Sequence, residues 1–141
     1  MGMIYLLDTN AWISYLNRRQ SQVADRLANT DPGTIRLCSV VKAELYYGAC
    51  KSARVPENLA LLGRLSLQFA SVPFDDPAAA EFGKIRARLA TVGTPIGPND
   101  LMIAAIAVVN GLTLVTHNTG EFGRIPGLLI DDWEAQGSQT P

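Results

Sequence analysis

Four acidic residues stand where an enzyme of this size would place its chemistry. Asp8 directly follows an apolar run, and Glu44 lies in a predicted helix. Asp100 lies in the first turn of a later helix, and Glu121 follows the last strong apolar run. Ligands of open parallel sheets bind beyond the carboxyl ends of the strands, so we expect these distant acids to converge at one edge of a sheet.

Carboxylates gathered without His or Cys neighbours form an oxygen-donor site, which suits Mg²⁺ or Mn²⁺ and not zinc. Two such ions about 3.5–4 Å apart would hold a phosphodiester, activate water and stabilise the leaving oxygen. His117 is the only histidine, which excludes a two-histidine acid–base ribonuclease, and we expect it in a structural or peripheral position. The pattern therefore indicates a site for divalent cations.

Glu44 is the most informative of the four. At 100° per residue its helix face is otherwise apolar or small, while Lys42 points nearly the opposite way. The residues that share the face are Val40, Val41, Tyr47 and Gly48. An unpaired charge buried there would cost several kcal/mol, so Glu44 must be protonated, paired with a cation such as arginine, or bound to a metal.

Each of the other acids has a simpler interpretation. Asp8 alone could cap the first helix, and Asp100 could be an ordinary acid at a helix N-terminus, stabilised by roughly 0.3–1 kcal/mol. Glu121 alone could be a solvated acid in a surface loop.

The elements that must position these acids are short apolar strands alternating with helices. Strands are predicted at 4–7, 35–38, 68–73, 112–116 and 128–130, and helices from the first cap to about 17 and at 21–28, 40–50, 56–67, 76–89 and 99–110. Thr9 or Asn10, Ser39 and the Asp76-Pro77 pair are the expected caps, and Gly111 is expected to end the last helix. The strands lack polar alternation, which indicates an α/β domain with a mainly parallel sheet of four to five strands covered by helices on both faces.

Length and composition agree with one domain, expected over residues 1–136, with a flexible tail at 137–141. Of the 141 residues, 48% are hydrophobic and 18% charged. The charged share lies below the roughly 25% of an average soluble chain, so a two-sided sheet or a subunit interface must hide much of the surface. Cys38 and Cys50 are expected to be inert packing residues.

With a net charge of −1, the protein has no overall positive field that would attract a nucleic acid. A nucleic-acid partner would therefore need a local basic patch. Between Arg36 and Arg88 there are eight basic and five acidic residues, an excess that permits RNA binding but also fits ordinary solvated helix faces. The apolar start is interrupted by Asp8 and resembles neither a signal peptide nor a membrane anchor, so a cytoplasmic protein is expected.

Several stretches, taken in this order, resemble a PIN domain, and more closely the VapC-type toxins of bacterial toxin–antitoxin pairs. They are LLDTN at 6–10, SVVKAELYYG at 39–48, GPNDLMIA at 97–104 and LVTHNTGEF at 114–122, with IPG at 125–127.

The resemblance implies a PIN-like fold and a Mg²⁺-dependent endoribonuclease, for which Mn²⁺ can substitute, acting on RNA. Its metal-binding acids would be Asp8, Glu44, Asp100 and Glu121. Asn10, Thr116 and Asn118 would orient the acids or a metal-bound water, as outer polar groups usually do, and Asn118 is an alternative to Glu121 for the fourth position.

The resemblance also implies a small antitoxin partner and a toxin homodimer. Candidate contacts are Tyr15, Tyr46, Tyr47 and the helix at 56–67 with Leu59, Leu62 and Leu65, although the same residues also fit a simple core.

Two other functions compete with this interpretation. A haloacid-dehalogenase-like phosphatase would use Asp8 as nucleophile, but it normally has a second Asp where this chain has Asn10. A catalytically inactive PIN-fold binding module would keep the partner contacts and lose the chemistry, and the presence of all four acids argues against it.

Overall fold

Five short parallel strands form the sheet that carries the acids. The structure is a computed structural model that describes residues 2–17 and 21–134. The strands are β1 (Tyr5–Leu7), β2 (Ile35–Cys38), β3 (Ala70–Val72), β4 (Thr113–Val115) and β5 (Leu129–Asp131). They pair in the order β3-β2-β1-β4-β5, and every pair is parallel. The predicted α/β class with a mainly parallel sheet is confirmed. The expected domain limit at 136 and the tail at 137–141 lie outside the described residues.

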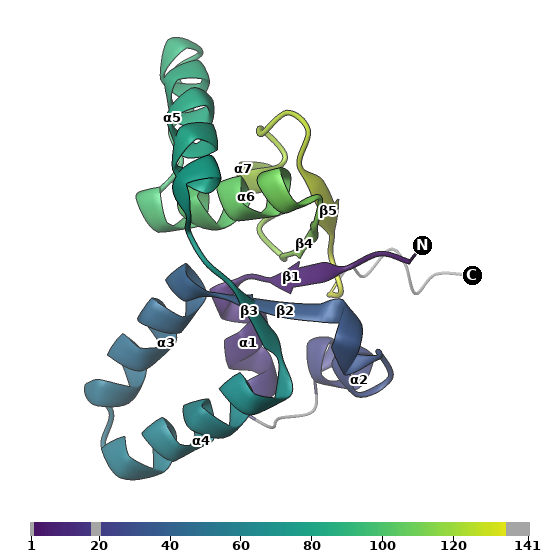
Figure 1. Cartoon of the computed structure of the whole chain (residues 1–141), viewed down its shortest axis with the longest axis vertical. Helices are drawn as coiled ribbons and strands as arrows, with labels where there is room; N and C mark the ends of the chain where they lie inside the picture. Colours follow the sequence, from purple (N-terminus) through teal and green to yellow (C-terminus); the bar gives the residue numbers. More distant parts are fainter. Residues whose placement is uncertain (1, 18–20, 135–141) are drawn as a thin grey trace.

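Helices cover both faces of this sheet. They are α1 (Thr9–Leu16), α2 (Gln22–Ala28), α3 (Ser39–Cys50), α4 (Val55–Gln68), α5 (Asp76–Thr91), α6 (Pro98–Asn110) and α7 (Thr119–Phe122), with a 3₁₀ turn at Pro32–Thr34. Parallel crossovers are right-handed, so the connections from β1 to β3 and those from β3 to β5, which run in opposite directions across the sheet, lie on opposite faces. Figure 1 shows this division, with α5, α6 and α7 on one side of the strands and α1 to α4 on the other.

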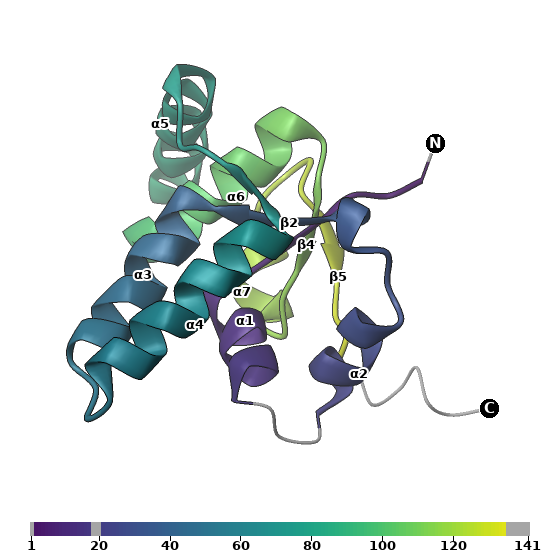
Figure 2. The same cartoon turned by 60° about the horizontal axis from the view of Figure 1, so that its bottom comes forward.

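Apolar side chains from both faces bury most of the three inner strands, whereas the edge strands β3 and β5 are partly exposed. Leu6, Leu37 and Leu114 have no exposed surface, which explains why the strands are continuous apolar runs in the sequence. On one face α1 lies beside α3, which pairs with α4 (Figure 2), and Trp12 of α1 packs edge-on against Phe69 at 5.0 Å. No helix in the described part of the chain is both long and apolar enough to cross a membrane.

The helix starts differ from the predicted caps. Asp8, not Thr9 or Asn10, caps α1, because its Oδ1 accepts a hydrogen bond from the Ala11 N–H at 2.8 Å. The simpler interpretation of Asp8 as the cap of the first helix is therefore correct, and since a carboxylate has two oxygens, Asp8 can cap α1 and still face the site.

Two further caps are displaced by one residue. Ser39 is the first residue of α3 and makes no cap, because its Oγ accepts a hydrogen bond from the Phe74 N–H at 3.0 Å. Asp75 caps α5 in place of Asp76, through the Ala78 N–H at 3.1 Å. The predicted end of the last long helix is confirmed, since Gly111 takes the left-handed conformation with φ of 64°.

The two cysteines have different environments. Cys38 is fully buried, and burial raises the pKa of its thiol to about 11, as expected of an inert packing residue. The same prediction for Cys50 is wrong, because this residue is exposed at the end of α3.

Candidate functional site

The acids meet where the strand order reverses, between β1 and β4. Leu7 pairs with Val115, and Val115 with Asp131, so these strands end level with one another. The Asp8 N–H donates to the Val115 carbonyl at 3.0 Å, which places Asp8 immediately beyond the sheet. Thr116 follows β4 in the same way. This switch point is where open α/β sheets bind their ligands.

Asp8 is a buried carboxylate, with only 6% of the residue exposed. Burial is the main cause that raises its pKa, and the charges of Glu134 and Glu44 add to the effect. Hydrogen bonds from Thr116 and the Ala11 N–H act in the opposite direction. The net effect is a raised pKa, so a positive charge nearby would stabilise the Asp8 carboxylate.

Glu44 projects from the half-buried face of α3 and is held by neutral donors. The Thr9 hydroxyl donates to Oε1, and the Asn99 amide donates to Oε2 at 3.3 Å. The predicted face is only partly buried, because Tyr47 is 67% exposed. These bonds fix the direction of Glu44 without neutralising its charge.

Asp100, in the first turn of α6, shows most directly that the four acids converge. Its pKa is raised to about 6, first by burial and then by a hydrogen bond with Glu121. The charges of Glu121, Glu44 and Asp8 raise it further. Asp100 is thus within electrostatic reach of the other three predicted acids, although Glu121 lies in the short helix α7 and not in a loop as predicted.

No basic side chain neutralises this group within the described residues. The ion pairs found in 2–17 and 21–134 join Arg26 to Asp131, Arg54 to Glu57, Lys84 to Glu81 and His117 to Asp132, and none includes these acids. An arginine partner for Glu44 is thus not found there. We define Asp8, Glu44, Asp100 and Glu121 as the carboxylate site.

The carboxylate site fits a hard divalent cation by the chemistry of its donors. All its ligating atoms are carboxylate oxygens, and their mutual repulsion would be relieved by a cation. In the described part of the chain, no three Asp, Glu, His or Cys side chains are placed to share an ion, so the carboxylates do not form a complete coordination shell. The site supplies the donors without a finished coordination shell.

The predicted neighbours of the acids occupy different positions. Thr116 is buried, and its hydroxyl accepts a hydrogen bond from the Asn118 N–H at 3.0 Å. Asn118 precedes α7 and Asn10 lies in the first turn of α1, and both are exposed. Thr116 therefore shapes the edge of the site, while the two asparagines face solvent.

Three residues at the site were not predicted. Thr9 and Asn99 hold Glu44, and each adjoins a predicted acid in the sequence, a signal that would have found them. Glu134 adds negative charge near Asp8 and follows no recognisable motif.

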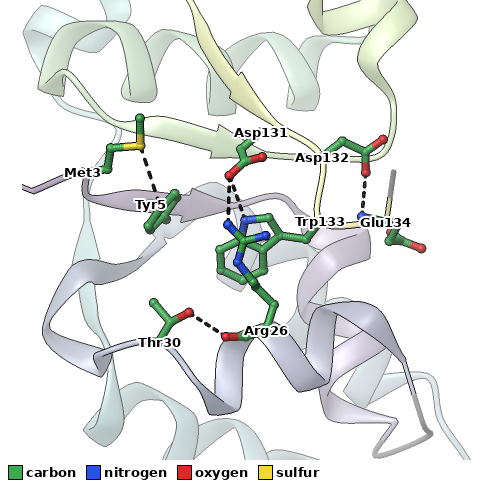
Figure 3. A network of polar contacts seen from close by, with 8 residues as sticks. All are labelled: Met3, Tyr5, Arg26, Thr30, Asp131, Asp132, Trp133 and Glu134. Atoms are coloured by element: carbon green, nitrogen blue, oxygen red, sulfur yellow. Dashed lines mark hydrogen bonds and ion pairs between the residues drawn. The ribbon is translucent and has the colours of Figure 1, made fainter. Parts of the chain in front are cut away.

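A polar network fixes the segment that carries Glu134 (Figure 3). Asp131 accepts a hydrogen bond from the Trp133 indole at 3.1 Å and pairs with Arg26 at 3.6 Å. The guanidinium of Arg26 also lies 5.1 Å from the centre of the Trp133 ring, which packs on Tyr5. We define Arg26, Asp131 and Trp133 as the C-terminal network.

His117 lies at the rim of the site, in a peripheral position as expected. It is exposed, and its Nδ1 is 3.1 Å from Oδ2 of Asp132. Its hydrogen bond with Asp132 is the main cause that raises the His117 pKa, and the charges of Asp132 and Glu134 contribute.

Comparison with known proteins gives consistent matches over most of the chain. A family profile described as PIN domain matches residues 5–128. The tRNA(fMet)-specific endonuclease VapC of Salmonella typhimurium is 40% identical over 92% of this chain and 97% of its own length. Ribonuclease VapC2 of Rickettsia felis is 35% identical over 94% and 99%.

Solved structures agree with these matches. DNA-bound VapBC from Salmonella typhimurium superposes with a TM-score of 0.86 at 39% identity, covering 94% of this chain and 99% of the other. VapBC2 from Rickettsia felis, bound to a fragment of promoter DNA, gives a TM-score of 0.84 at 35% identity, covering 93% and 99%.

Proposed function

Because the chain belongs to the PIN-domain family, and within it to the VapC ribonucleases, we propose that it is a divalent-cation-dependent endoribonuclease that acts as the toxin of a toxin–antitoxin pair. The single observation that carries the chemical part is the convergence of four carboxylates on Asp100, where the described residues provide no counter-charge. Such a group is electrostatically unfavourable at neutral pH unless it takes up protons or binds a cation.

We propose that Asp8, Glu44, Asp100 and Glu121 hold Mg²⁺, for which Mn²⁺ can substitute. When bound, the cation would supply a Lewis acid that activates water and neutralises charge on the phosphodiester. The chain's own residues orient the donors. The Ala11 N–H fixes Asp8, and Thr9 and Asn99 fix Glu44. Thr116 and the rim asparagines, Asn10 and Asn118, would position the substrate or a water molecule.

The proposed substrate is RNA, and transfer RNA is the first candidate because the Salmonella relative is named as a tRNA(fMet)-specific endonuclease. The protein would act in the cytoplasm, where that RNA is found. Glu121 is the proposed fourth acid in preference to Asn118, because it hydrogen-bonds with Asp100.

The proposed antitoxin partner has a suitable surface. A groove of about 300 Å³ runs between α1, α3 and α4, is lined by Ile13, Leu16, Leu45, Leu61 and Leu62 among others, and includes Glu44. An antitoxin segment lying in this groove would approach the carboxylate site. Of the predicted contacts, Leu62 and Leu65 of α4 are buried in the core, whereas Tyr46 and Tyr47 of α3 are exposed.

We also propose a homodimer. This proposal rests on the family resemblance and on the low share of charged residues, 18%, which agrees with a surface covered by a partner.

The test of this function uses purified protein freed of any antitoxin. We expect it to cut total RNA at defined positions in the presence of Mg²⁺ and to lose this activity in EDTA. Its far-UV circular dichroism should stay unchanged in EDTA, because the apolar core does not depend on the metal. Sequencing of the cut ends identifies the RNA. Cleavage that persists in EDTA, or folded protein that cuts no RNA with Mg²⁺, would refute the proposal.

A further inference from the structure

Three exposed basic residues lie together on the side of the molecule that carries Asp100 and Glu121. Lys84 and Arg88 are four residues apart on α5, so they share one face of that helix. Both line a groove of about 180 Å³, together with Glu81, Ile85 and Pro126 of the loop between α7 and β5. The groove is thus formed by α5 on one side and by the segment that follows Glu121 on the other.

Arg124, the third basic residue, belongs to the same segment, two residues before Pro126. Its guanidinium donates to the carbonyl of Pro95 at 3.3 Å. The loop that holds Pro95 reaches the end of α5, because the Thr94 N–H donates to the Leu89 carbonyl at 3.0 Å and so folds this loop back on the last turn of the helix. Arg124 is therefore anchored at the end of α5 that carries Arg88.

This basic corner adjoins the carboxylate site. The backbone N–H of Arg124 donates to the carbonyl of Glu121 at 3.2 Å, and Glu121 in turn hydrogen-bonds with Asp100. One turn of chain separates the acids from the first arginine. The backbone of an RNA bound at the carboxylate site, if it extends toward α5, would therefore lie next to positively charged side chains.

The local charge balance favours an anion. Among the described residues, Glu81 is the only acid that lines the groove, and it pairs with Lys84 at 3.7 Å. No ion pair involving Arg88 or Arg124 occurs in residues 2–17 and 21–134. Arginine guanidinium groups bind phosphate through paired N–H donors, and exposed arginines can do so with little rearrangement.

We propose that Lys84 and Arg88, with Arg124 on the adjoining segment, form a phosphate-binding groove that holds the RNA backbone on one side of the cleaved bond. The inference rests on the proposed ribonuclease function and adds to it the direction in which the substrate leaves the acids. Phosphate contacts carry no sequence information, so the groove contributes affinity and orientation, and not choice of sequence. Lys84 and Arg88 belong to the excess of basic residues between Arg36 and Arg88, so the groove assigns a role to part of that excess.

The test compares two double variants that remove the same charges. Lys84→Ala with Arg88→Ala changes the groove, and Lys51→Ala with Arg54→Ala changes the turn between α3 and α4. Alanine is a good helix former, so α5 should remain folded, which a thermal melt checks. Cleavage kinetics are measured with a short RNA substrate in Mg²⁺.

For the groove variant we expect KM to rise about tenfold while kcat stays within about twofold of the parent. The slope of log affinity against log salt should become shallower by about 1.4, since each lost contact to a single strand removes about 0.7. The matched variant should keep the parental KM and slope. Equal KM values for the parent and the groove variant, or equal losses in both variants, would overturn the groove.

Binding without cleavage separates this inference from the proposed function. In EDTA, fluorescence anisotropy measures the affinity of each protein for a single-stranded RNA oligonucleotide and for a DNA oligonucleotide of the same sequence. The groove variant should bind RNA and DNA more weakly than the parent does, and by the same factor, because both carry phosphates. A loss of affinity confined to RNA would contradict phosphate binding in the groove. A parent that binds RNA through the groove but does not cleave it in Mg²⁺ would refute the ribonuclease function and leave the groove standing.

Discussion

Two charged clusters at the edge of the sheet differ in how their charges are balanced. In the C-terminal network, the positive Arg26 lies beside the negative Asp131, and Trp133 supplies both a donor and an aromatic face (Figure 3). In the carboxylate site, the charges of Glu121, Glu44 and Asp8 add to burial in raising the pKa of Asp100 to about 6.

This difference distinguishes charges that stabilise the fold from charges that require a bound ligand to be balanced. A matched network stabilises the chain end without any added component. A cluster of like charges opposes folding, and a sequence keeps such a conflict mainly at functional sites. A cation that binds only the native state reverses the penalty.

Replacing Asp100 by asparagine should have the largest effect. Asn keeps the shape of the side chain but removes the charge that a hard cation needs. We expect RNA cleavage to fall by orders of magnitude, measured on a gel with Mg²⁺. The metal-free variant should be at least as stable as the parent, because repulsion is relieved, whereas loss of a purely structural cap would cost on the order of 1 kcal/mol.

Asp25→Asn provides the matched control, because Asp25 is an exposed acid in the first turn of α2, outside the carboxylate site. It should cleave RNA like the parent. Parental cleavage by the Asp100 variant, or equal losses in both, would remove Asp100 from the proposed site.

The pH dependence of stability should show the same contrast more weakly. Asp100 has a raised pKa in the folded protein, about 6 against an ordinary value of 3.8, so the folded state holds this proton more tightly than the unfolded state. Its favourable contribution is complete below about pH 4 and is lost as pH rises through about 6. The side-chain amide of the Asp100→Asn variant cannot titrate, so this variant lacks the effect.

Urea unfolding in EDTA between pH 4 and 8 measures this effect. The free energy of unfolding of the parent should decline relative to that of Asp100→Asn as pH rises, and the difference should level off above about pH 7. A stability difference between the two proteins that is constant across this pH range would contradict the expectation. So would a parent that becomes more stable relative to the variant as pH rises.

Arg26→Ala should have the smallest effect. Its side chain is 52% exposed, so solvent screens its pairing with Asp131, and an exposed cation–π contact contributes only about 0.5–1 kcal/mol. We expect a stability loss of about 1 kcal/mol or less by thermal melting, with RNA cleavage within about twofold of the parent. A loss of cleavage comparable with that of Asp100→Asn would show that the two clusters are not separate.

Asp8 and Glu121 were predictable because each follows the end of a strand, where parallel sheets place their ligands. Glu44 was predictable as a carboxylate on a largely apolar helix face, and Asp100 as an acid in the first turn of a helix. The β2 strand and the Gly111 helix end were predictable for similar reasons, since both depend on residues adjacent in sequence. The fold required only the alternation of apolar strands and helices.

The helix caps and Glu134 were harder to predict because they depend on tertiary contacts. Ser39 has the right chemistry for a cap, but its hydroxyl accepts from Phe74, 35 residues away. Glu134 approaches Asp8 only because Trp133 is held on Tyr5 and Asp131. Contacts between residues far apart in the sequence cannot be predicted from a local sequence pattern.

The most direct measurement of the central claim is Mg²⁺ binding by the metal-free parent and by Asp100→Asn, followed through the melting temperature and by calorimetric titration. Selective binding to the native state stabilises it by about 1.4 kcal/mol at ten times Kd, which corresponds to a rise of a few degrees. We predict this rise for the parent and a much smaller one for the variant, with binding heat lost in parallel. Unchanged melting of the parent at millimolar Mg²⁺, or the same rise in both proteins, would contradict a cation site built on these carboxylates.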